Sequence, residues 1–103
     1  MSNVTGQPVL AEQATSIDYW LAHLRQTVQF GPCMAHLEKT GGHVYVEVGP
    51  GHALSNLARR SSAAVRAVSL LPRRGSDACS AASLIQGVGQ LWECGAVIDA
   101  DAF

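Results

Sequence analysis

The sequence has few charged residues for its length and no strong excess of either sign. Of its 103 residues, 15% are charged and 48% are hydrophobic, whereas an ordinary globular chain carries about 25% charged residues. Seven Lys and Arg against eight Asp and Glu give a formal net charge of -1, which argues against capture of nucleic acid or of an anionic membrane. The apolar excess argues against a disordered chain and predicts one that packs against further protein.

Cysteines and long apolar runs are also scarce. The three cysteines, Cys33, Cys79 and Cys94, lie far apart and form no CxxC pair. An odd number of separated cysteines favours reduced thiols, as in the cytoplasm. No apolar run approaches the roughly 20 residues that a membrane helix requires, and the polar residues after Met1 do not form a secretory signal. We therefore expect a cytoplasmic protein without a membrane segment.

Motifs typical of enzymes and metal sites are missing as well. No serine lies in a GxSxG pattern, no histidine pair has HExxH spacing, and no Cys/His set has zinc spacing. The turn Gly49-Pro50-Gly51 lacks the lysine of a P-loop, and Leu54 stands where a dinucleotide-binding pattern has its third glycine. This turn is therefore interpreted as structural, and no metal site is expected.

The distribution of apolar residues predicts an α/β fold. Helical spacing predicts four helices, at about residues 16–26, 32–40, 52–60 and 77–94. Runs rich in β-branched residues predict two short strands, at about 43–48 and 64–71. Because a helix connects the two strands, they are expected to run parallel, with a right-handed crossover. The prediction is a partial three-layer α/β/α arrangement.

Several residues are expected to set the ends of these elements. Thr15 or Ser16 can cap the first helix and Asp77 the last, while Gly41 and Gly95 are suited to end helices. The segment Asn3-Val4-Thr5 can be the end of a strand before Gly6 and Pro8 interrupt it.

The last predicted helix carries two glycines and a tryptophan on its apolar stripe. Gly87 and Gly89 each cost a helix roughly 1 kcal/mol relative to Ala, so they are interpreted as points of close packing. Trp92, like Trp20 on the first helix, lies on an apolar stripe, and both are expected to pack in the core.

Three charged features leave alternatives open. Arg59-Arg60 and Arg73-Arg74 can hold a phosphate, although such pairs more often lie at a helix C-terminus or on a solvated loop. Glu47 interrupts an apolar strand, so its carboxylate either faces solvent or is held by a buried partner. By these tests alone the chain is an α/β piece without an evident active site.

Short motifs follow one another in a fixed order along the chain. They are Ser2-Asn3-Val4-Thr5-Gly6, Tyr19-Trp20, His23-Leu24-Arg25-Gln26, Glu47-Val48-Gly49-Pro50-Gly51, Arg73-Arg74-Gly75 and Leu91-Trp92. In this order and spacing, over residues 2–103, the chain resembles the C-terminal part of an acyltransferase domain of modular polyketide synthases, in the malonyl-CoA:acyl-carrier-protein transacylase family. The resemblance implies an incomplete large subdomain of the acyltransferase fold, with residues 1–71 in the core and 72–103 forming the terminal helix and the segment after it.

The resemblance also implies a reaction and its partners. The complete domain would move malonyl or a related acyl group from CoA to the phosphopantetheine of an acyl carrier protein, through an acyl-serine intermediate with histidine as general base. In the family the serine, the histidine and a carboxylate-binding arginine precede the matched stretch. No catalytic residue and no bound cofactor are therefore expected in this chain, which is expected to be inactive alone and to pair with the remainder of the domain and the synthase.

Supporting roles near the reacting groups are implied for five residues. In the family, a main-chain carbonyl at the position of His23 accepts a hydrogen bond from the catalytic imidazole, which would fix the orientation of the base. Asn3 and the turn Gly49-Pro50-Gly51 would line the floor of the same site.

Two other functions are weighed against this one. The first is a non-enzymatic assembly module that self-associates or binds a partner through an exposed apolar face. The second is a small anion- or nucleotide-binding module that uses residues 49–52.

Overall fold

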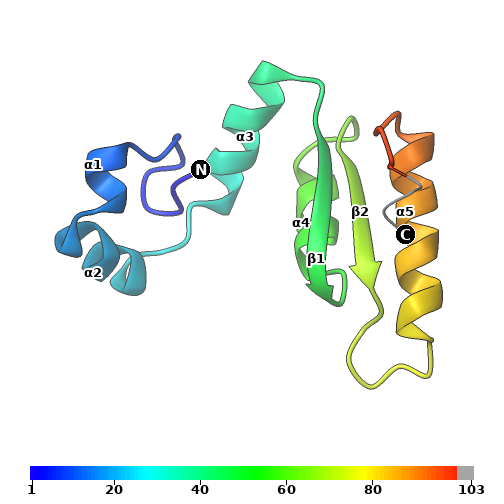
Figure 1. The fold of residues 1–103 in the computed structure, drawn as a ribbon. Coiled ribbons are helices and arrows are strands. Elements are labelled where there is room, and N and C mark those ends of the chain that lie inside the picture. Colours follow the sequence, from blue (N-terminus) through cyan, green and yellow to red (C-terminus); the bar gives the residue numbers. More distant parts are fainter. Residues whose placement is uncertain (100–103) are drawn as a thin grey trace. The chain divides into compact units, whose positions relative to one another are not determined.

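The computed structural model describes residues 1–99 and contains seven regular elements in that range. They are α1 (Ala11–Ala14), α2 (Ile17–Arg25), α3 (Phe30–Thr40), β1 (Val44–Pro50), α4 (Ala53–Ser61), β2 (Arg66–Leu71) and α5 (Ser80–Glu93) (Figure 1). The chain divides into two compact units, the first ending at Gly42 and the second beginning at His43, and each is described separately. No helix within residues 1–99 is long and apolar enough to cross a membrane.

The first unit begins with a tight turn instead of the end of a strand. Ser2 is buried, and its hydroxyl oxygen accepts hydrogen bonds from the N–H groups of Val4 (3.2 Å) and Thr5 (3.3 Å). The N–H of Gly6 donates to the Ser2 carbonyl at 2.8 Å. The strand-end prediction for Asn3-Val4-Thr5 is therefore wrong, because local bonds to Ser2 use the N–H groups that a ladder would need.

Gly6 closes this turn against the start of α3. Its φ is 71°, in the left-handed region that favours glycine. A Cβ at this position would lie 2.5 Å from the Cβ of Pro32, closer than two carbon atoms can approach. The absence of a side chain at Gly6 is therefore what allows these two segments to touch.

Helices α2 and α3 begin and end close to the predicted positions. The Ser16 side chain accepts a hydrogen bond from the Tyr19 N–H at 3.4 Å, which confirms Ser16 as the N-cap of α2. Helix α3 runs from Phe30 to Thr40, and its C-cap Gly41 has a φ of 67°, which suits a helix stop. The short helix α1 was not predicted; the N–H of Leu10 at its start donates to the Gln13 side chain at 2.9 Å.

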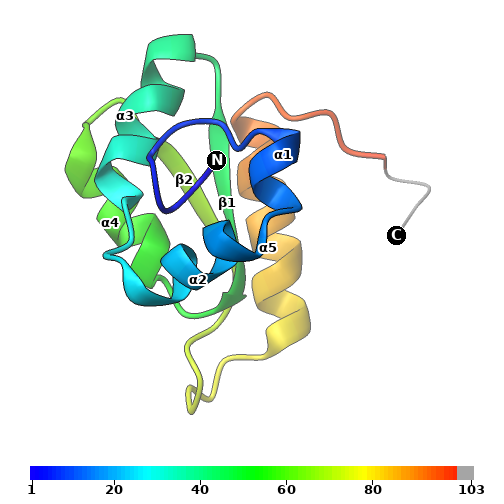
Figure 2. The same ribbon diagram turned by 90° about the vertical axis from the view of Figure 1, so that its left-hand side faces the viewer.

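The second unit is a parallel two-stranded sheet between two helices. β1 pairs with β2 in parallel, with Val46 opposite Val68 and Glu47 opposite Ser69, which confirms the predicted strand–helix–strand unit. Helix α4 connects the strands, and the two views show the strands lying between α4 and α5 (Figures 1 and 2). This unit has the predicted three layers.

Helix α5 starts three residues later than predicted. Its N-cap is Cys79, not Asp77. Before it, the Ser76 N–H donates to the Arg73 carbonyl at 3.0 Å, and the Ala78 N–H donates to the Ser76 hydroxyl at 3.0 Å. These bonds form a turn around Asp77, so the aspartate is not placed to cap the helix. The helix ends at Glu93 with Cys94 as its C-cap, and Gly95 follows with a φ of 90°.

One of the two glycines in α5 is a close-packing point. A Cβ on Gly87 would lie 2.8 Å from Leu70 Cδ2 and 3.3 Å from the Ser69 carbonyl oxygen on β2. Gly87 is buried, as predicted for a helix-to-sheet contact. A Cβ on Gly89 would meet no atom of residues 1–99 within 4 Å, so the packing interpretation is wrong for that residue within the described part of the chain.

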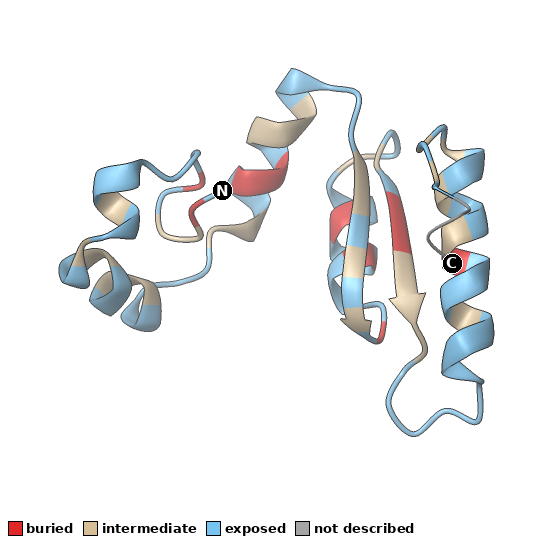
Figure 3. Cartoon of the chain, viewed as in Figure 1, coloured by how far each residue is buried: buried red, intermediate tan, exposed pale blue. Residues whose placement is uncertain are grey.

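Few side chains are buried in either unit. The buried hydrophobic residues are Cys33, Met34, Ala58, Ala67 and Val68 (Figure 3). Large apolar side chains remain exposed on both units, and the exposed fraction is 78% for Ile17 and 80% for Val48. Trp20 is 51% exposed and Trp92 70%, so the prediction that both pack in the core is wrong within this chain. The apolar stripes are real, but the described residues do not cover them.

Candidate functional site

The turn from β1 into α4 is held by the carboxylate of Glu47. Its Oε1 accepts the Leu54 N–H at 3.1 Å, and its Oε2 accepts the Ser55 N–H at 2.9 Å. Oε2 also accepts the Ser69 hydroxyl at 3.3 Å, and the Ser55 and Ser69 hydroxyls lie 2.8 Å apart. His52, the N-cap residue of α4, makes no side-chain capping bond. Glu47 therefore caps the helix from the strand that precedes it.

These contacts explain the ionisation of Glu47. Burial of the carboxylate raises its pKa, but hydrogen bonds from Ser55, Leu54 and Ser69 outweigh burial, so the pKa of Glu47 lies below the ordinary value of 4.5. A carboxylate at a helix N-terminus is also stabilised by the helix dipole. Of the two interpretations of Glu47, the one with a held carboxylate is confirmed.

The same contacts bear on the turn Gly49-Pro50-Gly51. Gly51 is buried and has a φ of 107°, a conformation that favours glycine. An external phosphate at residues 49–52 would need the free N–H groups at the start of α4. Two of them, those of Leu54 and Ser55, already bind the chain's own Glu47. The structural interpretation of this turn is favoured over the nucleotide-binding one.

His23 lies in the last turn of α2. It is half-buried, and its ring is tilted against Trp20, with 5.5 Å between ring centroids. The N–H of Gln26 donates to the Ala22 carbonyl at 2.8 Å. No backbone N–H within residues 1–99 donates to the carbonyl of His23, as is usual in the final turn of a helix. This carbonyl can accept a hydrogen bond from outside the helix.

Asn3 connects the N-terminal turn to the start of α3. Its carbonyl accepts the Gln29 N–H at 2.8 Å, and its side-chain oxygen lies 3.9 Å from the thiol sulfur of Cys33. The Cys33 thiol also donates to the Ser2 carbonyl at 3.3 Å. The Tyr19 hydroxyl donates to the Ser2 hydroxyl at 2.8 Å, so a hydrogen-bond network joins this turn to α2 as well.

The five predicted site residues are divided between the two units. Asn3 and His23 belong to the first unit, where the network around Ser2 places their segments. Gly49, Pro50 and Gly51 belong to the second. Their convergence on one catalytic floor stays a prediction.

Cys79 is a feature that the sequence analysis missed. N–H groups of Ala82 and Ala81, in the first turn of α5, lower the pKa of its thiol, while burial has the opposite, smaller effect. Cys79 is exposed and Cys33 is buried; Cys33, Cys79 and Cys94 are all free cysteines. The predicted helix began at residue 77, which placed Cys79 inside the helix and not at its N-cap. The lowered pKa was missed for this reason, because a cysteine at a helix N-terminus is more acidic than an ordinary one.

The second unit is a strand–helix–strand–helix part of an α/β protein. Comparisons with known proteins show which class of protein the whole chain resembles. No family model matches it. The chain is 32% identical over its full length to a segment of polyketide synthase GfsA from Streptomyces halstedii, and 35% identical over 96% of its length to phenolphthiocerol synthesis polyketide synthase type I Pks15/1 from Mycobacterium marinum. It spans only 1% and 5% of these proteins.

Two solved structures resemble the fold closely. The acyl transferase domain of SpnD, in complex with 2-(pent-4-yn-1-yl)malonyl, matches 92% of the chain with a TM-score of 0.86 and 33% identity. The acyl transferase domain of ZmaA matches 96% with a TM-score of 0.87 and 28% identity. The chain spans 24% of each of these two. It therefore belongs with the acyltransferase domains of polyketide synthases and corresponds to a C-terminal part of such a domain.

Proposed function

We propose that this chain completes the large subdomain of a polyketide synthase acyltransferase and supports the active-site histidine that another part of the domain carries. The complete domain moves malonyl or a related acyl group from CoA to the phosphopantetheine thiol of an acyl carrier protein. The observation that carries the proposal is the close match of almost the whole chain to about a quarter of two acyltransferase domains. The substituted malonyl group in the SpnD complex supports a malonyl-type substrate.

The proposed reaction has two transfers. A serine hydroxyl attacks the thioester carbonyl, the carbon–sulfur bond breaks, and the histidine passes the serine's proton to the departing CoA thiolate. The carrier's thiol then gives its proton to the histidine and attacks the carbonyl of the acyl-serine ester. The bond between the acyl carbon and the serine oxygen breaks, and the histidine returns the proton to that oxygen, which regenerates the serine hydroxyl. No serine in this chain has the GxSxG surroundings of such a nucleophile, so the proposal assigns the nucleophile and base to the rest of the domain.

The role of this chain is to position the base. The imidazole N–H of the base would donate a hydrogen bond to the main-chain carbonyl of His23, and this bond would hold the ring in one tautomer. Because the main chain makes this bond, the His23 side chain can be replaced without loss of the role. Asn3 and the turn held by Glu47 would form the adjoining floor. The same proposal places the protein in the cytoplasm, with its three free cysteines reduced.

Acylation assays on separate and combined parts test this proposal. We expect the 103-residue chain alone to take no label from malonyl-CoA and to pass none to a carrier protein. Co-expression with the preceding part of a related acyltransferase should restore transfer, and His23→Ala should retain most of it. Serine-dependent acylation of the chain alone would overturn the proposal.

The exposed apolar side chains favour a second candidate, an assembly module that does no chemistry. Val48 is 80% exposed and Trp92 70%, and such surfaces usually bind protein. A stable homo-oligomer of defined size in sedimentation would support this candidate. Monomers that form a stoichiometric complex with the rest of the domain would support acyltransferase completion.

A further inference from the structure

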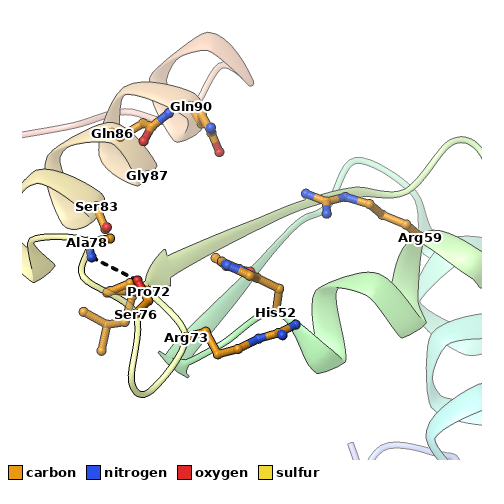
Figure 4. A pocket seen from close by; sticks show the side chains of 12 residues that line it. His52, Arg59, Pro72, Arg73, Ser76, Ala78, Ser83, Gln86, Gly87 and Gln90 are labelled. Carbon is orange, nitrogen blue, oxygen red and sulfur yellow. Dashed lines mark hydrogen bonds between the residues drawn. The ribbon is translucent and has the colours of Figure 1, made fainter.

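The second unit contains an open pocket that none of the roles above uses. Its volume is about 550 Å³, within the usual range for small-ligand pockets. Its walls come from both ends of α4, the end of β2, the loop that follows β2, and one face of α5 (Figure 4). Every wall lies within the second unit, so the pocket does not depend on the first unit.

The pocket is lined by cations and hydrogen-bonding groups. Arg59, Arg73 and His52 contribute basic side chains, and no Asp or Glu is among the described lining residues. Serines and glutamines also line the pocket: Ser69, Ser76, Ser83, Gln86 and Gln90. Figure 4 shows the Arg73 side chain beside His52, and the Arg59 side chain extending toward the pocket from the C-terminal part of α4. Basic side chains that line one pocket, with no carboxylate among its described lining residues, favour a bound anion.

The arginines retain free donors. Arg59 donates through Nη2 to the Ala67 carbonyl on β2, which orients the guanidinium and leaves most of its five N–H groups available. Arg73 lies in the loop between β2 and α5. Within residues 1–99 its main-chain carbonyl accepts the Ser76 N–H, and its side chain makes no hydrogen bond. Its side chain is therefore free to turn toward a ligand.

Glu47 does not cancel this positive charge. Its carboxylate lies 3.3 Å from the Ser69 hydroxyl, at the edge of the pocket. It is already bound by the N–H groups of Leu54 and Ser55 at the start of α4, and the helix N-terminus offsets part of its charge. The positive charges of the two arginines remain.

We propose that this pocket is a binding site for a phosphate group, held between Arg59 and Arg73 with hydroxyl and amide donors around it. Two planar guanidinium groups suit the several oxygens of a phosphate, which can accept bidentate bonds from each. The ligand is either free inorganic phosphate or the phosphate ester of a small cofactor. The phosphate would not use the N–H groups of Leu54 and Ser55 at the start of α4, which already bind Glu47.

Titrations of the 103-residue chain followed by amide and arginine side-chain NMR test the site. Inorganic phosphate, CoA and pantetheine, which has no phosphate, are the three probes, at constant ionic strength. We expect shifts at residues 73–78 and at the Arg59 side chain with inorganic phosphate, with CoA, or with both, and none with pantetheine. Shifts with inorganic phosphate identify a free-phosphate site, and shifts with CoA alone identify an ester site.

Neighbouring arginines give matched controls. Arg73→Ala removes a loop side chain that makes no hydrogen bond to the described residues, and we expect it to weaken binding about tenfold, the loss of one charge-assisted contact. Arg74→Ala and Arg60→Ala remove arginines that do not line the pocket and should leave binding within twofold. Arg59→Lys keeps the charge and should weaken binding less than Arg59→Ala.

Equal effects of Arg73→Ala and Arg74→Ala, or no shift with either phosphate probe, would overturn the proposal. These titrations measure no acyl transfer, so a failure of the phosphate-site proposal would leave the acyltransferase proposal untouched.

Discussion

Replacing Glu47 by glutamine keeps the size of the side chain and removes its charge. Both carboxylate oxygens accept N–H groups in the native turn, from Leu54 at 3.1 Å and Ser55 at 2.9 Å. A glutamine has one oxygen and one NH₂ group, so one of these N–H groups must face another donor. Hydrogen bonds to charged groups contribute about 1.5–3 kcal/mol each. We expect Glu47→Gln to destabilise the second unit by about 2 kcal/mol, allowing for partial solvent screening.

The pH dependence of this loss is a sharper test. The pKa of Glu47 is lowered in the folded state, below the ordinary 4.5, so the carboxylate stabilises the fold above that value and loses this effect as the pH falls through the folded pKa. The stability difference between wild type and Glu47→Gln should therefore be full near neutral pH and should shrink in acid.

Hydrogen exchange can measure this in the second unit alone. The amides of Leu54 and Ser55 should exchange faster in Glu47→Gln, together with those of β1 and β2. Glu93→Gln is the control, because Glu93 is exposed and lies at the C-terminal end of α5; a surface change of this kind should stay within about 0.5 kcal/mol. Equal protection of Leu54 and Ser55 in wild type and Glu47→Gln near neutral pH, or a stability difference that grows in acid, would refute the capping role.

Two further results are expected in the second unit, each with an internal comparison. Gly89→Ala should stabilise α5 by about 0.5–1 kcal/mol, because its Cβ meets open space. Gly87→Ala should stabilise α5 less than Gly89→Ala or destabilise it, because its Cβ would meet Leu70 and the sheet. Thermal unfolding of both variants measures which one is more stable. A Gly87→Ala variant more stable than Gly89→Ala would contradict the close packing of Gly87 on β2. In thiol alkylation across pH, Cys79 should react at lower pH than an ordinary cysteine, since helix N–H groups lower its pKa, whereas buried Cys33 should react only on unfolding. Mass spectrometry of the alkylated peptides separates the two.

The sequence predicted the second unit well because its signals are local. The β-branched runs around Val46 and Val68 placed both strands within a few residues of their observed bounds, and the intervening helix required them to be parallel. The capping role of Glu47 was within reach of the same reasoning. His52 is a poor N-cap, and a carboxylate five residues earlier, at the end of a strand, is positioned to replace it.

Other features could not be predicted because they depend on a local turn or on a packing partner that the sequence does not reveal. Asp77 is a good helix cap by type, but the turn from Arg73 to Ala78 makes Cys79 the N-cap and Ser80 the first helical residue instead. The exposed Trp92 lies on a correctly predicted apolar stripe. Its exposure could not be predicted, because a stripe identifies a face that packs but not whether the packing partner belongs to the same chain.

The contact of Gly6 with Pro32 limits how this part of the chain can vary. Any side chain at position 6 would meet both a backbone conformation that disfavours it and a proline carbon 2.5 Å away. A compensating change at Pro32 would relieve only the second of these. In a library of all single substitutions, position 6 should therefore tolerate almost nothing, and second-site suppressors near α3 should rescue it only in part.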